Sequence, residues 1–234
     1  MSSSLTRSGL AAGTTSGSYV LAITAGGLAA VVAAVGVLHM PFARGFLMSV
    51  GGCPVGHAKL AELEPARRAA IAAERGIEAA PARPALGFEL DRTTRAETRA
   101  WADRTHVACD EVREGLLRCK DVPSTALGLS DSDGPVSELY FGFDTRGRLV
   151  DVSTMRMHLS SSRVARDVQG KLVSEVGAPH QTSGSFDEAH LAREGAQSLA
   201  SLRYRYKDYF AEVIAMRFAG DGLVLREHYM SAND

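Results

Sequence analysis

The sequence has few cysteines, little tryptophan and almost no net charge. It contains three cysteines and one tryptophan in 234 residues, and its formal net charge is -1. A near-neutral charge balance argues against a nucleic-acid-binding protein, which normally carries a basic face. Glycine-rich phosphate loops are missing too, because the Gly-x-Gly at Gly220 and Gly222 precedes an expected strand rather than a helix and so indicates a turn.

The usual spacings of metal ligands and catalytic residues are also absent. No Cys-x-x-Cys or His-x-x-x-His pair occurs, and the histidines are scattered along the chain. His158 next to serines and His228 next to Glu227 both lie within patterns that a helix cap or a strand explains. We therefore expect no catalytic residue, no metal, no cofactor and no enzymatic activity. A membrane-tethered hydrolase with an unrecognised nucleophile is the alternative.

Charged residues are missing altogether from residues 8 to 43. Within this window, residues 18–38 read SYVLAITAGGLAAVVAAVGVL. A helix of this length spans about 30 Å, the thickness of a bilayer core. The run is too long for the apolar core of a signal peptide, which is usually about 7 to 15 residues. The sequence therefore predicts one uncleaved transmembrane helix.

The predicted span divides the chain into four parts. A short tail, residues 1–17, precedes the transmembrane helix at 18–38. Residues 39–85 are expected to form an interfacial segment, a helical stalk that Pro65 splits into two short helices, and a proline-containing linker at 77–85. Residues 86–234 form the main domain.

The first half of this domain shows clear helix and hairpin signals. Thr94 followed by Glu97 has the spacing of a capping box and predicts a helix that runs through Trp101. Alternating apolar residues on both sides of the sequence DTRG, residues 144–147, predict a β-hairpin with its turn there.

The second half repeats the order of a helix followed by strands. A serine cap and one apolar stripe predict a helix that ends at Gly177 (stripe: Val164, Val168, Leu172, Val176). After a loop with a short helix near residues 186–194, three alternating segments predict a meander of strands (Leu202, Tyr204, Tyr206; Ile214, Met216, Phe218; Leu223, Leu225, Tyr229). We expect an α+β domain with an antiparallel sheet, helices packed on one face, and a duplicated helix-then-strands unit.

Cys109 and Cys119 lie ten positions apart in the sequence THVACDEVREGLLRCKDV. If the two flanking segments form strands joined by a turn centred on Glu114, the two cysteines lie opposite each other, within disulfide range. Two free thiols or a metal site are the alternatives. A disulfide implies an oxidising compartment, and hence a C-terminal domain in the periplasm or at the cell exterior.

Two further features suggest contacts rather than chemistry. Cys53, in VGGC, is interpreted as a thiol in an interfacial loop, with lipidation as the alternative. The sequence SLRYRYKDYF interleaves tyrosines with basic residues and is the first place to look for a partner surface (Arg203, Tyr204, Arg205, Tyr206, Tyr209). Strand alternation instead favours tyrosines directed inward and charges directed outward.

The order of a capped helix ending in VGAP, residues 176–179, then a loop and a meander, resembles the helix-then-strands domains of bacterial envelope proteins. Examples are the small lipoprotein of the outer-membrane β-barrel assembly machinery and the β-lactamase inhibitory proteins. The resemblance implies a non-catalytic binding or assembly module outside the cytoplasm. We expect a single-pass inner-membrane protein that binds another envelope protein. A small accessory subunit of a membrane complex is a further alternative.

Overall fold

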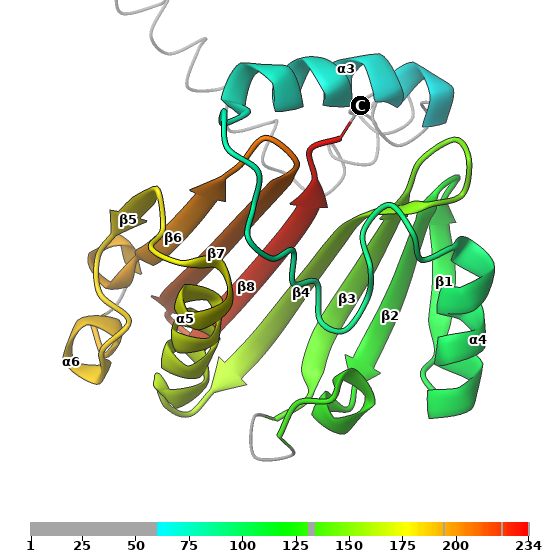
Figure 1. The fold of residues 1–234 in the computed structure, drawn as a ribbon. Coiled ribbons are helices and arrows are strands. Elements are labelled where there is room, and N and C mark those ends of the chain that lie inside the picture. The colour runs from blue at the N-terminus through cyan, green and yellow to red at the C-terminus, as the bar shows by residue number, and fades with distance from the viewer. Residues whose placement is uncertain (1–59, 131–133, 194, 221, 234) are drawn as a thin grey trace, which may run out of the picture. The chain divides into compact units, whose positions relative to one another are not determined.

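The computed structural model describes residues 60–130, 134–193, 195–220 and 222–233 (Figure 1). The tail, the predicted transmembrane helix and the interfacial segment with Cys53 lie outside these residues. None of the helices in the described ranges is long and apolar enough to cross a membrane. The elements are α3 (Leu60–Glu74), α4 (Arg95–Thr105), β1 (Cys109–Arg113), β2 (Leu116–Val122), η2 (Ser124–Leu127), β3 (Val136–Phe143), β4 (Leu149–Leu159), α5 (Arg163–Val176), β5 (Gln181–Ser183), α6 (Glu188–Leu191), η4 (Gly195–Ser198), β6 (Ala200–Arg205), β7 (Tyr209–Phe218) and β8 (Gly222–Ser231).

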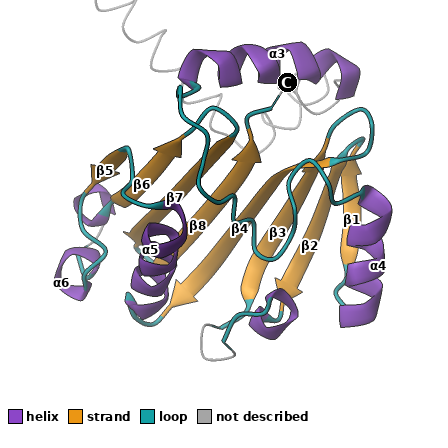
Figure 2. Cartoon of the chain, viewed as in Figure 1, coloured by secondary structure: helices purple, strands orange, loops and turns teal. Residues whose placement is uncertain are grey.

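The eight strands form one antiparallel sheet in the order β1-β2-β3-β4-β8-β7-β6-β5 (Figure 2). Each half of the sheet consists of four strands that follow one main helix in the sequence, α4 for the first half and α5 for the second. The last strands of the two halves, β4 and β8, pair at the centre. The predicted α+β class is confirmed, and the helix-then-strands order does occur twice.

Local sequence signals account for the two main helices. The side chain of Thr94 accepts a hydrogen bond from the backbone of Glu97, and the Glu97 carboxylate accepts one from the Thr94 backbone, so the capping box is present. Helix α5 ends at Gly177, whose φ of 93° favours glycine. The hairpin between β3 and β4 turns at residues 144–147, as predicted, with Asp144 accepting backbone hydrogen bonds from Arg146 and Arg148.

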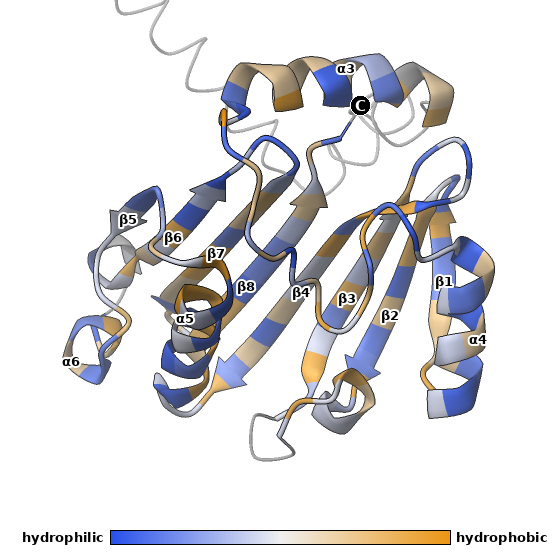
Figure 3. Ribbon diagram, in the orientation of Figure 1, coloured by the Kyte–Doolittle hydropathy of each residue, from blue (hydrophilic) through white to orange (hydrophobic). Residues whose placement is uncertain are grey.

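One face of the sheet carries the main core. Apolar residues of α5 lie buried against it, and on α4 Trp101 meets Phe88 and Phe141 edge to face. Hydrophilic and hydrophobic residues alternate along the central strands (Figure 3), as expected for a sheet with one face on the core. The segment between α3 and α4 also packs on the core, through Ala85, Leu86 and Leu90. The expected linker at 77–85 is therefore partly built into the domain.

Helix α3 lies at one end of the opposite face (Figure 1). It is one continuous helix with Pro65 inside it, whereas the sequence predicted two short helices. Its apolar contact with the sheet is centred on Ile71, which packs with Phe210, Met230 and Ala232. Pro65 lacks a backbone N–H and so removes one hydrogen bond from this helix.

A buried ion pair lies within the core face between β4 and β8. The Arg156 side chain is 1% exposed, and its Nη2 lies 3.4 Å from Oε1 of Glu227. The Glu227 carboxylate also accepts hydrogen bonds from the hydroxyl of Tyr229, at 2.6 Å, and from that of Thr154, at 3.4 Å. Nε and Nη1 of Arg156 are buried and have no hydrogen-bond partner within the described part of the chain. The charge of each residue is therefore balanced mainly by the other.

Candidate functional site

The face of the sheet opposite α4 and α5 is the candidate site, and we call it the open face. Among the described helices, only α3 lies on it, and only at one end. Strand register places one row of polar side chains across its middle. These side chains come from seven strands in turn (Asp110, Arg118, Tyr140, Ser153, His228, Glu212, Arg203).

The charges in this row are paired with one another. Arg118 donates to Asp110 at 2.8 Å, and Arg203 pairs with Glu212. The charges of these four residues therefore balance one another. Because the pairs are partly exposed, each contributes little to stability.

Next to the polar row lies a group of half-buried apolar side chains that we call the methionine patch (Met155, Met157, Ile214, Met216, Val224). Met155 and Ile214 both lie beside Arg226 on β8, and Met216 lies opposite Val224. The core side of β7 is instead formed by Ala211, Val213 and Ala215. The alternation of Ile214, Met216 and Phe218 was thus a correct strand signal, but it marks the open face rather than the core.

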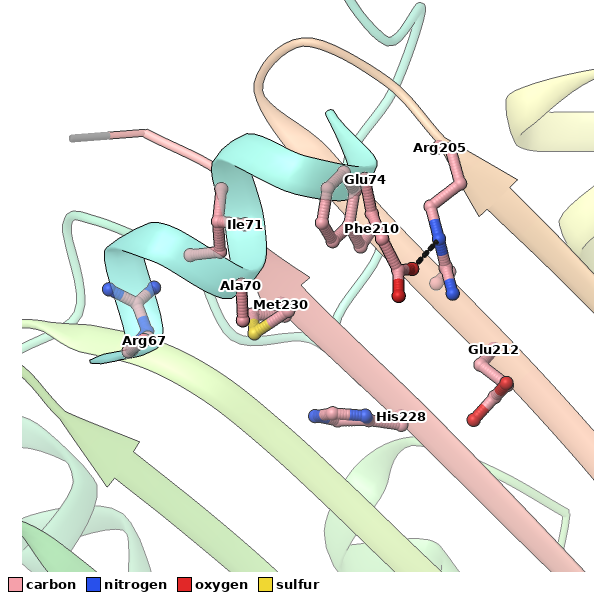
Figure 4. A pocket seen from close by; sticks show the side chains of 10 residues that line it. Arg67, Ala70, Ile71, Glu74, Arg205, Phe210, Glu212, His228 and Met230 are labelled. Carbon is pink, nitrogen blue, oxygen red and sulfur yellow. Dashed lines mark hydrogen bonds and ion pairs between the residues drawn. The ribbon is translucent and has the colours of Figure 1, made fainter. Parts of the chain in front are cut away.

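On the other side of the polar row, a cavity of about 190 Å³ lies between α3 and strands β6, β7 and β8. Figure 4 shows the residues around it, with Ala70 and Ile71 on the helix above and His228 and Met230 on the sheet below. Arg205 donates to Glu74 at 2.7 Å, and its guanidinium lies 5.1 Å from the ring centroid of Phe210. This ion pair closes one end of the cavity.

The histidine of the cavity is held by an acid. Nε2 of His228 lies 2.6 Å from Oδ2 of Asp151, which comes from β4. Burial by itself lowers the pKa of His228, but the charge of Asp151 and its hydrogen bond outweigh burial and raise that pKa above its usual value. The nearby Glu212 acts in the same direction, and Arg226 opposes it. The ring therefore holds its proton more tightly in the folded protein.

This shift predicts a pH dependence of stability. The raised pKa stabilises the fold fully below about pH 6.5, the unfolded-state value, and this stabilisation is lost as the pH rises through the folded-state pKa of His228. The D151N variant removes the charge that raises the pKa. We measure the free energy of unfolding in urea for both proteins. We expect the advantage of the wild type over D151N to decrease above pH 6.5. Parallel pH profiles for the two proteins would contradict this assignment.

The predicted partner surface is not a single surface. The side chains of Tyr204, Tyr206 and Tyr209 are buried on the core face, while Arg203 and Arg205 lie on the open face. Each tyrosine hydroxyl donates to a backbone carbonyl, that of Gly177, Val176 and Pro84 respectively. Burial raises the pKa of Tyr204 to about 12, which keeps its hydroxyl protonated as a donor. The tyrosines therefore fix α5 and the segment before α4, as the alternation of the strand favoured.

Cys109 and Cys119 form a disulfide between β1 and β2, with their Cα atoms 4.1 Å apart. They are register partners, and the neighbouring pair of Asp110 and Arg118 has the same register. This pairing is the predicted one, although the turn lies at residues 114–115 and a β-bulge between Glu111 and Arg113 restores the register expected for a turn centred on Glu114. The disulfide joins β1, the edge strand among the described strands, to β2.

Three features of the site were not identified from the sequence: the methionine patch, the pair of His228 and Asp151, and the cavity under α3. Asp151 and His228 are 77 residues apart, and only the pairing of β4 with β8 brings them together. The patch could have been found from the excess of methionine and isoleucine at positions that alternate with core residues.

No protein-family model, curated protein or solved structure matches this chain.

Proposed function

We propose that this chain is a membrane-anchored binding or assembly component of the bacterial cell envelope, and that its open face binds a protein partner. The observation that carries the proposal is the methionine patch, which lies on a sheet face that the main helices leave uncovered. Methionine adapts its shape to a partner, and methionine, tyrosine and arginine are enriched at protein interfaces. Tyr140, Arg118 and Arg203 lie on the same face, in the polar row beside the patch.

The proposed location rests on two separate features. The uncharged stretch at residues 18–38 has the length and composition of a membrane anchor. The disulfide between Cys109 and Cys119 favours an oxidising compartment, the periplasm or the cell exterior. Together they support an inner-membrane protein with its C-terminal domain outside the cytoplasm.

The proposal predicts that charges in the methionine patch release the partner. We expect the double variant M155E/M216E to lose the larger assembly that the wild type forms after gentle detergent extraction, as seen by native gel migration. Glutamate places two desolvated charges in an apolar contact, which weakens binding by at least about tenfold. The control is V173E on the outer face of α5, where Val173 is 41% exposed. If M155E/M216E is folded by circular dichroism but migrates as the wild type does, the open face is not the binding surface.

A hydrolase is the second candidate, and one observation favours it. Ser153 lies directly opposite His228 in the strand register, and His228 is held by Asp151. This is the set of residue types found in a serine nucleophile with its base and orienting acid. No hydrogen bond joins the described side chains of Ser153 and His228, which leaves the binding module better supported. Labelling by a fluorophosphonate probe that is abolished in S153A would favour the hydrolase; equal labelling of both proteins would exclude Ser153.

A further inference from the structure

The cavity under α3 has the size of a binding site for one side chain. Its volume is about 190 Å³. Sites for drug-sized molecules begin at about 300 Å³. The cavity opens beside the polar row of the open face, since His228 and Glu212 belong to both. A partner seated on the open face would therefore reach it directly.

The charges around the cavity already have partners. Arg205 pairs with Glu74, Arg67 with Glu64 at 3.5 Å, and the same guanidinium of Arg67 donates to the backbone carbonyl of Ser231 at 2.9 Å. On the sheet, Glu212 pairs with Arg203, and His228 with Asp151. A charged occupant would add an unpaired charge to this balanced set, so the lining favours a neutral occupant.

The surface of the cavity is apolar on two sides and polar at one place. Phe210, Met230 and Ile71 offer an aromatic ring, a thioether and a branched side chain, which together suit an aromatic ring. His228 uses Nε2 for Asp151, and its Nδ1 has no partner within the described part of the chain. This nitrogen can form one hydrogen bond with a hydroxyl in the cavity.

We propose that this cavity binds a tyrosine side chain of the protein partner, with the ring against Phe210 and Met230 and the hydroxyl on Nδ1 of His228. The source of the tyrosine rests on the proposed function, whereas the chemistry of the cavity does not. Tyrosine is among the residues that carry most binding energy at interfaces, where it fills a pocket near the centre. Helix α3 forms one wall of this binding site, where the small side chain of Ala70 leaves room for the ring.

The test uses p-cresol, the side chain of tyrosine, added to the purified full-length chain. We expect p-cresol to shift the ¹³C methyl resonance of Met230. The titration should give a dissociation constant of about 1 mM or lower, as is common for a ligand of this size. The Met155 methyl, on the far side of the polar row, should not shift. Toluene, which lacks the hydroxyl, should bind at least about fivefold more weakly because it makes no hydrogen bond to His228.

Two matched variants of α3 place the site. A70F should fill the cavity from above and weaken p-cresol binding at least about tenfold, whereas A69F, at the neighbouring position outside the cavity lining, should leave it unchanged. If A70F detaches α3, the comparison of p-cresol with toluene on the wild type still tests whether the cavity recognises the hydroxyl. Equal binding of p-cresol and toluene, or no shift at Met230, would overturn the inference, even if M155E/M216E still released the partner. Binding of p-cresol as expected, with no effect of M155E/M216E on assembly, would instead overturn the proposed function.

Discussion

The R156L variant is expected to lower the free energy of unfolding by about 3–5 kcal/mol, the usual cost of removing one partner of a buried ion pair. Leucine keeps much of the volume of the side chain but leaves the carboxylate of Glu227 buried without its counter-charge. The hydroxyls of Tyr229 and Thr154 still donate to Glu227, but they are neutral and cannot replace the guanidinium. Equilibrium unfolding in urea measures the change.

A second variant separates the charge from the loss of packing. R156L/E227Q removes both charges while keeping an amide oxygen that can accept from Tyr229, so it should recover about half or more of the lost free energy. The control is R92L, because Arg92 is 82% exposed in its pair with Glu89 and its loss should cost no more than about 0.5 kcal/mol. If R156L/E227Q is no more stable than R156L, the unpaired charge is not the cause.

The second large effect concerns the disulfide. We expect C109A/C119A to lower the free energy of unfolding by about 2–3 kcal/mol, because the cross-link closes a loop of about ten residues and limits the unfolded chain. Strand β1 should be affected first, since it is an edge strand with a mostly exposed burial pattern. Urea unfolding with and without reductant measures this. Reductant should destabilise the wild type and leave C109A/C119A unchanged.

Thiol labelling in intact cells checks both the pairing and the compartment. When thiols are alkylated before the cells are opened, denatured protein should show two further thiols, those of Cys109 and Cys119, only after reduction. Labelling of all three cysteines without reduction would contradict the disulfide in cells, and with it the main support for a domain outside the cytoplasm.

Most of the fold could be predicted because its signals are local. The capping box at Thr94, the turn at residues 144–147 and the glycine at 177 each act within a few residues, and the structure has all three. The pairing of Cys109 with Cys119 also followed from a short turn. The continuity of α3 through Pro65 could not be predicted, because a proline inside a helix removes a backbone hydrogen bond and usually kinks or ends the helix.

The candidate site was less predictable because it depends on how distant strands pair. Alternation in β7 showed two faces, but it did not show which one the helices cover. The sequence around Glu227 indicates only a strand. It does not predict the ion pair with Arg156, which lies 71 positions earlier, on β4. Alternation favoured inward tyrosines, but it did not show that their hydroxyls donate to carbonyls of α5 and of the segment before α4. Only the assembled sheet shows these contacts.

Contact between the open face and a partner is tested most directly by site-specific photo-crosslinking of the full-length chain in cells. A photoreactive amino acid replaces Tyr140 or Ile214 on the open face, or Val173 on the outer face of α5 as the control. The account predicts one discrete cross-linked product of higher mass from Tyr140 and from Ile214, and none from Val173. Products from Val173 alone, or none from either open-face position, would contradict it.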